Sequence, residues 1–357
     1  MVSQGNVRML RAVKRRRRIK PDSDVILICN PKAGGRWKEL AGILDSEEAQ
    51  SVRRIVTDSV EDVAAGLAEL GDEAKLICIY GGDGTIQRIL DCLGEDEKAH
   101  LALLGGGTMN VTSRWCGFTR DPARNFRHVI QGYRTGDLLL KEVPLLDVRT
   151  GSERHRGFTL GMGPMVRLLD KYEQGRKGKV AAVETAAKAV AAVWLKGPGR
   201  YRELLELMEA EVEIDGEVLP YERFSAIFAN TTGQINPGVE PFTKSRKRDA
   251  FHSAAYAVGA RELTMALPFL SRGLLPIDLS ALLSPSKFRN RGKDEPPLPA
   301  DPRYHNKPAS ELIVRSQEPK YTVDGEILTT YGNELRVDIG LTLKLAMGPK
   351  HGSRLGL

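Results

Sequence analysis

The stretch LICIYGGDGT at residues 76–85 is the most informative segment of this 357-residue chain. Its apolar half is typical of a buried strand, and the glycines that follow directly predict a tight loop. Glycine lets the backbone approach a ligand closely, and Thr85 is suited to cap a helix opening at Ile86, whose free N–H groups attract phosphate. Asp83 fits such a loop if it holds Mg²⁺ or an acceptor hydroxyl, because phosphates repel a bare carboxylate. The segment predicts phosphoryl transfer, with an ordinary glycine turn as the alternative.

Two other loops have the same design. The apolar run at residues 25–29 leads into NPKAGG at residues 30–35, and the run at residues 101–104 leads into GGGTMN at residues 105–110. A short strand near residues 54–57 and a helix beginning with a capping box at residues 59–62 separate the first two loops. Strands that alternate with helices predict a parallel sheet, in which the loops after the strands share one edge. We therefore expect three phosphate-binding loops to meet there.

These motifs resemble the diacylglycerol kinase catalytic family, which includes bacterial lipid kinases, sphingosine kinases and ceramide kinases. The resemblance rests on residues 30–34, 81–85 and 107–110 and on the sequence VDGE at residues 323–326, and it extends from about Asp24 across most of the chain. The GGDGT block is shared with NAD kinases and phosphofructokinases. The Asn-Pro start and the Gly-Thr-x-Asn loop favour the lipid kinases.

The resemblance implies a fold of two domains, one α/β and one β, with a cleft between them for ATP and a lipid. The first is a Rossmann-like parallel α/β nucleotide domain at residues 21–143, to which residues from about 328–357 return. The second is a β-sandwich-like, lipid-binding domain at residues 144–327. Residues 1–20 precede both domains.

The resemblance also implies roles for individual residues. Asp324 is the expected general base, Glu326 supports it, and Asp83 lies at the Mg-ATP or acceptor site. Asp147 matches an acid near the domain junction, and Asp249 matches, less securely, a ligand of a structural Mg²⁺. The residues expected to bind the nucleotide are Asn30, Pro31, Lys32, Gly34, Gly81, Gly82, Gly84, Thr85, Gly107, Thr108 and Asn110.

Some positions depart from the family pattern. Val111 follows Asn110 where the family has an acid, Arg88 stands in place of a glutamate, and Ala250 replaces a glycine after Asp249. From the residues alone, VDGE at 323–326 is also a good β-hairpin signal with Asp-Gly as its turn. The similar sequence at residues 213–218 is expected to be a purely structural hairpin.

The positive charge of the chain is concentrated at its start. Residues 1–20 hold eight of the 53 basic residues and no acid, so the rest of the chain has 45 basic against 46 acidic residues. Such an arm is typically disordered, and it can bind either an anionic membrane or nucleic acid. With a lipid kinase site in the same chain, we expect the membrane and no nucleic acid.

Composition favours a cytoplasmic, peripherally membrane-associated protein. The four cysteines lack metal-type spacing and read as reduced packing residues, and no apolar run is long enough for a membrane span or a signal peptide. The Ala-rich helix at residues 180–195 and the apolar, loop-like stretch at residues 265–277 are candidates for the path of the acyl chain, although both also fit a core. A homodimer remains open.

The sequence thus predicts an ATP- and Mg²⁺-dependent lipid kinase, a phosphotransferase whose acceptor is an alcohol group. Diacylglycerol is the expected lipid, and a sphingoid base is the second choice. Two alternatives stay open, namely an enzyme like NAD kinase and a catalytically weak regulator that binds lipid or nucleotide. The altered positions Val111 and Arg88 are the main reason to keep the regulator in view.

Overall fold

The computed structural model describes residues 24–33, 36–45, 49, 52–57, 62, 74–95, 97–107, 110–173, 188, 191, 194, 203–235, 240–242, 249–278 and 300–352. Several sequence predictions lie outside these residues: the basic arm, Gly34, Thr108 and most of both the capping box at residues 59–62 and the Ala-rich helix at residues 180–195.

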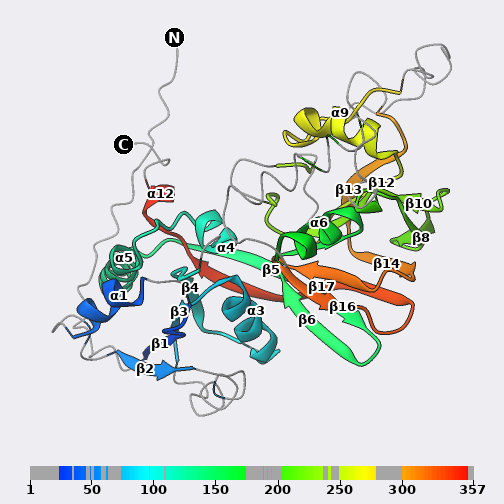
Figure 1. The fold of residues 1–357 in the computed structure, drawn as a ribbon. Coiled ribbons are helices and arrows are strands. Elements are labelled where there is room, and N and C mark those ends of the chain that lie inside the picture. The colour runs from blue at the N-terminus through cyan, green and yellow to red at the C-terminus, as the bar shows by residue number, and fades with distance from the viewer. Residues whose placement is uncertain are drawn as a thin grey trace, which may run out of the picture.

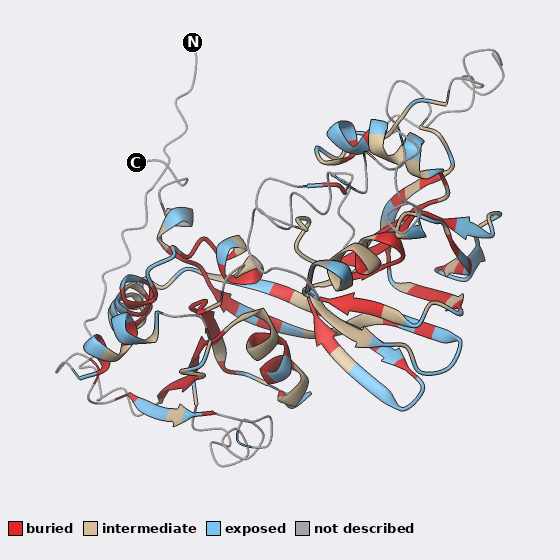
Figure 2. Ribbon diagram, viewed as in Figure 1, coloured by how far each residue is buried: buried red, intermediate tan, exposed pale blue. Residues whose placement is uncertain are grey.

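The first half of the chain builds a parallel sheet. Its strands lie in the order β2 (Arg53–Val56), β1 (Val25–Cys29), β3 (Leu76–Tyr80) and β4 (His100–Leu103), and all three neighbouring pairs are parallel. Every residue of β1 and β3 is buried (Figure 2). These continuous apolar runs are typical of strands covered on both faces. The helices of this half are α1 (Trp37–Leu44), α3 (Asp83–Cys92), α4 (Val111–Trp115) and α5 (Pro122–Thr135).

Two long antiparallel strands, β5 (Leu140–Thr150) and β17 (Glu334–Ala346), run through the middle of the molecule (Figure 1). At its end β17 pairs in parallel with β4, while its first residues pair with β14 (Glu311–Ser316) in antiparallel register. One eleven-stranded sheet therefore extends through both halves. The expected boundary between residues 143 and 144 falls inside β5, so the halves share continuous backbone.

The second half is antiparallel. A six-stranded sheet has the order β13-β12-β11-β7-β15-β16, and the far part of the large sheet has the order β10-β8-β14-β17. The new strands are β6 (Glu153–Gly157), β7 (Thr159–Met162), β8 (Met208–Ile214), β9 (Glu217–Val218), β10 (Arg223–Phe224), β11 (Ala226–Asn230), β12 (Phe251–Tyr256), β13 (Tyr304–Ala309), β15 (Lys320–Val323) and β16 (Glu326–Thr329). Side chains from both sheets, such as Val148 of β5 and Phe251 of β12, form one shared core. The expected fold class, a parallel α/β half joined to an antiparallel sheet half, is confirmed.

The remaining helices are α6 (Pro164–Glu173), α9 (Ala260–Leu270) and α12 (Pro349–Gly352). The expectation that residues 265–277 form a loop is wrong for residues 265–270, which lie in helix α9. Pro268 lies near the C-terminal end of α9, so only one bond of the last turns is lost to its missing N–H. Among the described residues, no helix is long and apolar enough to cross a membrane.

Candidate active site

The loops after β3 and β4 are in backbone contact. A Cβ atom added to Gly107 would lie 2.7 Å from Cα of Gly82, closer than real Cβ atoms approach a backbone. The N–H of Gly106 also donates to the carbonyl of Gly81. Only residues without a side chain allow two loops to approach so closely. Gly107 is therefore the glycine that this close approach of the two loops requires.

The loop after β1 is tied to the GGDGT segment by side-chain hydrogen bonds. Asn30 donates from Nδ2 to Oγ1 of Thr85 over 3.2 Å, and its Oδ1 accepts from the N–H of Lys32 over 3.0 Å. Tyr80 donates from its hydroxyl to the carbonyl of Ala33 over 3.3 Å. Asn30 thus joins two of the predicted loops. The side chain of Lys32 is exposed and Pro31 is half-buried.

The start of α3 differs from the sequence prediction. Thr85 was expected to cap a helix opening at Ile86, but the helix begins at Asp83 with Gly82 in the capping position. Gly82 has an extended backbone, with φ −77° and ψ 176°, which lets the helix begin directly after it. Asp83 therefore lies in the first turn, where the helix dipole favours a negative charge. The hydroxyl of Thr85 instead accepts from Asn30.

Asp83 also connects its helix to the third loop. Its Oδ1 accepts from the N–H of Val111 at the start of α4 over 3.0 Å. Asn110 has a left-handed backbone with φ 49°, and its Oδ1 accepts from the N–H of Gly107 over 2.7 Å. Burial raises the pKa of Asp83 to about 6, against the effect of its hydrogen bonds and with added repulsion from Glu326. The departure at Val111 leaves this contact intact because only its backbone takes part.

Asp324 lies in the tight turn between β15 and β16. Asp324 and Gly325 both have positive φ, at 50° and 94°, as a two-residue hairpin turn requires. Both carboxylate oxygens accept from the N–H of Phe158, over 3.1 and 3.0 Å, and Oδ1 also accepts from Thr159 over 2.9 Å. The predicted hairpin is present, and its turn holds the carboxylate against a backbone segment of the second half. The comparison hairpin has the same turn at Asp215 and Gly216.

The surroundings of Asp324 hold its pKa close to neutrality. Burial raises the pKa of Asp324 to about 7, the N–H groups of Phe158 and Thr159 oppose this, and the charges of Asp83 and Asp91 add to it. An ordinary aspartate is fully ionised at pH 7 and a weak base. A carboxylate with a pKa near 7 is well matched to accepting a proton at neutral pH.

Three carboxylates from the two halves converge at this point. A Cβ atom added to Gly84 would lie 2.5 Å from Oε1 of Glu326, so Glu326 packs directly on the GGDGT segment. The charge of Glu326 helps to raise the pKa of Asp83, and the charge of Asp83 helps to raise the pKa of Asp324. The structure thus brings together the three predicted catalytic residues, at the edge where the glycine loops meet.

The acids fit Mg²⁺ bound together with a nucleotide. Mg²⁺ is usually held by one or two carboxylates plus substrate phosphates and waters, and Asp83 and Glu326 supply oxygen atoms of that kind. The described residues contain no group of three or more His, Cys, Asp or Glu side chains that is ready to hold a metal ion. We infer that phosphate oxygens would have to complete such a site.

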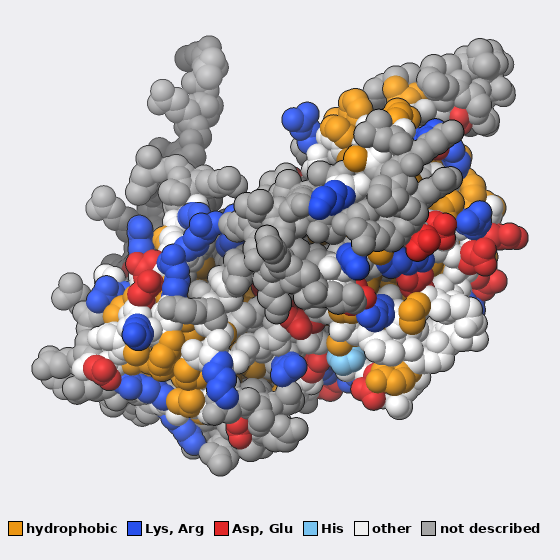
Figure 3. Space-filling view, in the orientation of Figure 1, with side chains coloured by type: hydrophobic (Ala, Val, Ile, Leu, Met, Phe, Trp, Pro, Cys, Tyr) orange, Lys and Arg blue, Asp and Glu red, His pale blue; other side chains and the backbone are white. Residues whose placement is uncertain are grey.

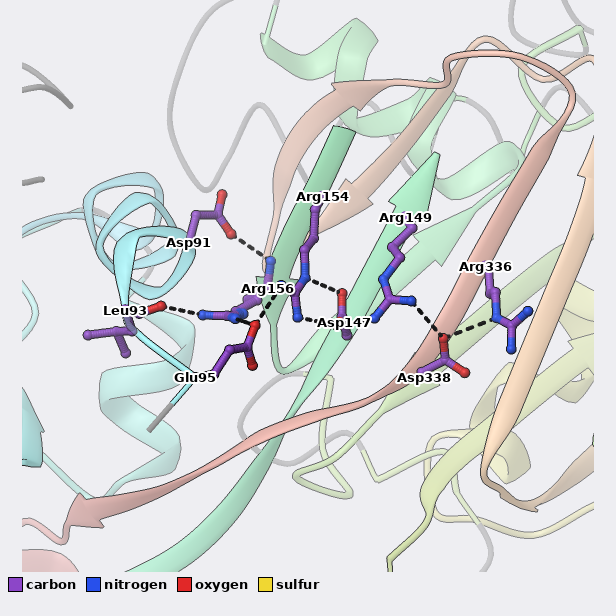
Figure 4. Close-up of polar contacts among 9 residues, drawn as sticks. All are labelled: Asp91, Leu93, Glu95, Asp147, Arg149, Arg154, Arg156, Arg336 and Asp338. Atoms are coloured by element: carbon purple, nitrogen blue, oxygen red, sulfur yellow. Dashed lines mark hydrogen bonds and ion pairs between the residues drawn. The ribbon is translucent and has the colours of Figure 1, made fainter. Parts of the chain in front are cut away.

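Asp147 lies in a network of ion pairs (Figure 4). Arg154 donates to both of its oxygens, from Nε over 2.9 Å and from Nη2 over 2.6 Å, and Arg149 donates over 2.8 Å. Burial alone would raise the pKa of Asp147, but the two arginines outweigh it and hold the pKa below its ordinary value. Arg154 also bonds Glu95, just beyond α3. Asp147 is therefore a structural anion that holds Arg154, and Arg154 in turn links β6 to the segment after α3.

Asp249 is exposed, with φ 57°, in the turn before β12. Its role as a ligand of a structural Mg²⁺ stays a prediction. Arg88, one of the departures from the family pattern, is exposed on α3. Gly81 is required where it lies, since a Cβ atom there would come within 2.5 Å of the side chain of Thr85.

Sequence reasoning missed three residues beside the site. Gln87 and Asp91 lie one and two turns after Asp83 on α3, and His155 lies on β6. Gln87 donates to Oδ2 of Asp91 over 2.8 Å, and Nδ1 of His155 lies 3.1 Å from the same oxygen. The spacing of four residues places Asp83, Gln87 and Asp91 on one helix face. This spacing is the signal that could have found Gln87 and Asp91.

The fold joins a parallel α/β half to an antiparallel sheet half, and the site lies where glycine-rich loops follow the parallel strands. Residues 24–139 match the family model of the diacylglycerol kinase catalytic domain. The resemblance inferred from the motifs is thus confirmed for this part of the chain.

A curated relative and two crystal structures agree with this assignment. Diacylglycerol kinase 7 of Arabidopsis thaliana is 30% identical over 116 residues, covering 26% of this chain and 24% of that protein. The chain thus matches about a quarter of the length of that relative. A diacylglycerol kinase from Bacillus anthracis str. Sterne aligns with TM-score 0.58 and 16% identity, over 92% of this chain and 97% of that one. A putative diacylglycerol kinase from the same organism gives TM-score 0.60 and 17% identity over 92% and 98%. These two structures share the fold.

Proposed function

We propose that this chain is an ATP-dependent lipid kinase that phosphorylates a lipid hydroxyl. The observation that carries the proposal is the convergence of Asp83, Asp324 and Glu326 from the two halves at the edge where the glycine loops meet. The family match of residues 24–139 favours diacylglycerol as the acceptor, with a sphingoid base as the second choice.

The proposed reaction is a direct transfer of the γ-phosphoryl group. The lipid oxygen forms a bond to the γ-phosphorus while the bond from that phosphorus to the β–γ bridging oxygen breaks, leaving ADP. Asp324 takes the proton of the attacking hydroxyl. The glycine loops and the start of α3 hold the phosphates. Asp83 and Glu326 would hold Mg²⁺, which would neutralise charge on the β- and γ-phosphates.

The test is transfer of labelled γ-phosphate from ATP in the presence of Mg²⁺, with diacylglycerol, sphingosine, ceramide, phosphatidylglycerol and NAD offered separately. We expect label on diacylglycerol or another of the lipids. Label on NAD alone would assign the chain to NAD kinase chemistry. Tight ATP binding with no labelled acceptor would favour a regulator.

An exposed apolar surface supports a lipid rather than a water-soluble acceptor. In the described part of the chain, five of the ten exposed large hydrophobic side chains lie on or just after α9. They gather at the upper right of the molecule (Figure 3) and are Met265, Leu267, Phe269, Leu274 and Ile277. A cavity of about 870 Å³ beside them is lined partly by Met265, Phe269 and Leu275. We propose that this surface inserts into a lipid bilayer.

Replacing Met265 and Phe269 together by aspartate should weaken binding to lipid vesicles at least about tenfold, because burying one such side chain contributes about 1.5–3 kcal/mol. Both side chains are more than half exposed, at 58% and 57%, so the substitutions leave the core intact. Val56→Asp on β2, where the side chain is also 58% exposed, is the matched control and should bind vesicles like the wild type. Equal loss in both variants would contradict the assignment to α9.

The basic arm should add a second, salt-sensitive contact with the membrane. A chain that begins at Pro21 loses eight positive charges, each worth about 1 kcal/mol near an anionic surface. We expect it to pellet less with anionic vesicles at low salt and equally at high salt, where the charges are screened. Equal pelleting of the two chains at low salt would contradict a membrane role for the arm.

A further inference from the structure

Helix α3 is attached to the second half of the molecule at both of its ends. At its first residue, Asp83 faces the acids of the β15–β16 hairpin. Eight residues later, about 12 Å along a helix axis at about 1.5 Å per residue, Oδ1 of Asp91 accepts from the N–H of Arg156 on β6 over 2.6 Å (Figure 4). The helix therefore spans the distance between the glycine loops and β6.

The strand that Asp91 contacts leads directly into the segment that holds Asp324. Among the described strands, β6 pairs only with β5, so its outer edge needs another partner for its N–H groups. Asp91 accepts the N–H of Arg156, and the next donors along the chain, Phe158 and Thr159, both donate to Asp324. Two carboxylates from opposite sides of the site thus share one short run of backbone.

Other contacts keep α3 and β6 in register. The buried guanidinium of Arg156 donates from Nη1 to the carbonyl of Leu93, just past the end of α3, over 2.6 Å, and it also pairs with Glu95. Gln87, itself buried, donates to Oδ2 of Asp91 and fixes its carboxylate. Asp91 joins the helix that carries Asp83 to the backbone segment whose N–H groups bind Asp324.

We propose that Asp91 is a positioning residue for phosphoryl transfer, which sets the separation between the phosphate loops and the proton-accepting carboxylate. This inference rests on the proposed function and extends it to a residue that contacts neither substrate. Its effect is on geometry at the reacting atoms and not on holding ATP, because the glycine loops are tied together by contacts of their own.

The test is a kinetic comparison of three variants. Asp91→Ala removes the acceptor and should lower kcat on the order of 10- to 100-fold, since a misplacement of about 1 Å can cost about 10²-fold, while KM for ATP stays nearly unchanged. Asp91→Asn keeps an oxygen that can accept from Arg156 and should restore kcat to within a few-fold of the wild type. If Asp91→Ala keeps the kcat of the wild type, or if its kcat and its affinity for ATP fall together, the proposal is overturned.

Asp215→Ala is the matched control. Asp91 accepts one backbone N–H, and Asp215 accepts two, from Ser310 and Glu311 over 2.8 and 2.9 Å, but at the far hairpin. It should lose a similar amount of thermal stability as Asp91→Ala and keep its kcat. A similar loss of kcat in both variants would show that Asp91 is only structural.

Hydrogen exchange separates this inference from the proposed function. In Asp91→Ala, the amides of residues 155–159 should exchange faster than in the wild type, whether or not a lipid is phosphorylated. Unchanged exchange there would overturn the attachment even in an active kinase. Faster exchange with no lipid product from the wild type would instead refute the proposed function and leave the attachment standing.

Discussion

Asp324→Asn should lower the rate of lipid phosphorylation by about 10²–10⁴-fold, the usual contribution of a positioned general base. The amide oxygen can still accept from Phe158 and Thr159, which both donate to Oδ1 in the wild type. The turn should therefore keep its geometry, so that the lost rate reports the lost base. Steady-state kcat at saturating ATP and lipid measures this directly.

The same substitution should make the protein more stable above neutral pH. The pKa of Asp324 is about 7 in the folded chain against an ordinary 3.8, so the folded state binds a proton that the unfolded state has released. The raised pKa therefore contributes its whole share to the free energy of unfolding below about pH 4, and this contribution is lost as the pH rises toward 7. The melting temperature of Asp324→Asn, measured relative to that of the wild type, should rise between pH 5 and pH 8. A constant difference would contradict the raised pKa.

Gly107→Ala should have the second largest effect, a loss of about 1–3 kcal/mol in the free energy of unfolding, as overpacking typically costs. The new Cβ would meet Cα of Gly82 at 2.7 Å, and neither backbone can move without separating the loops after β3 and β4. ATP should bind on the order of tenfold more weakly, the equivalent of about 1.4 kcal/mol. Chemical denaturation and nucleotide titration measure the two losses.

The control for Gly107→Ala comes from the other side of the same contact. A Cβ atom on Gly82 would lie 3.6 Å from Gly107, an ordinary separation, and the backbone angles of Gly82 suit any residue. Gly82→Ala should therefore keep most of its stability. If both variants lose stability equally, close backbone approach is not the reason for the glycines.

The fold was predictable from sequence because its decisive segments are local. The apolar runs of β1, β3 and β4 each lead into a glycine-containing loop, which is sufficient to predict a parallel sheet with loops at one edge. The turn at Asp324 and Gly325 was equally readable, since a two-residue turn with positive φ at both positions favours Asp-Gly. The proposed role of Asp324 came from the family resemblance, because hairpin chemistry alone does not distinguish Asp324 from Asp215.

The remaining features depend on contacts between distant segments. Asp147 was expected near the domain junction, but its pairing with Arg154 and Arg149 follows from the register of β5 and β6, which spacing does not give. The spacing of Asp91 from Asp83 indicates only a shared helix face, and its contact with the backbone N–H of Arg156 is one that no sequence pattern marks. Residues 265–277 were predicted to be loop-like, but residues 265–270 belong to α9, where Pro268 lies near the helix end and removes few hydrogen bonds.

The most direct test of the account is transfer of labelled phosphate from ATP to diacylglycerol by the wild type and by Asp324→Asn, measured side by side with saturating Mg²⁺. The account predicts labelled lipid from the wild type and about 10²–10⁴-fold less from the variant. Equal labelling by both would show that Asp324 is not the base. No labelled lipid from the wild type, with NAD labelled instead, would contradict the assignment of this chain as a lipid kinase.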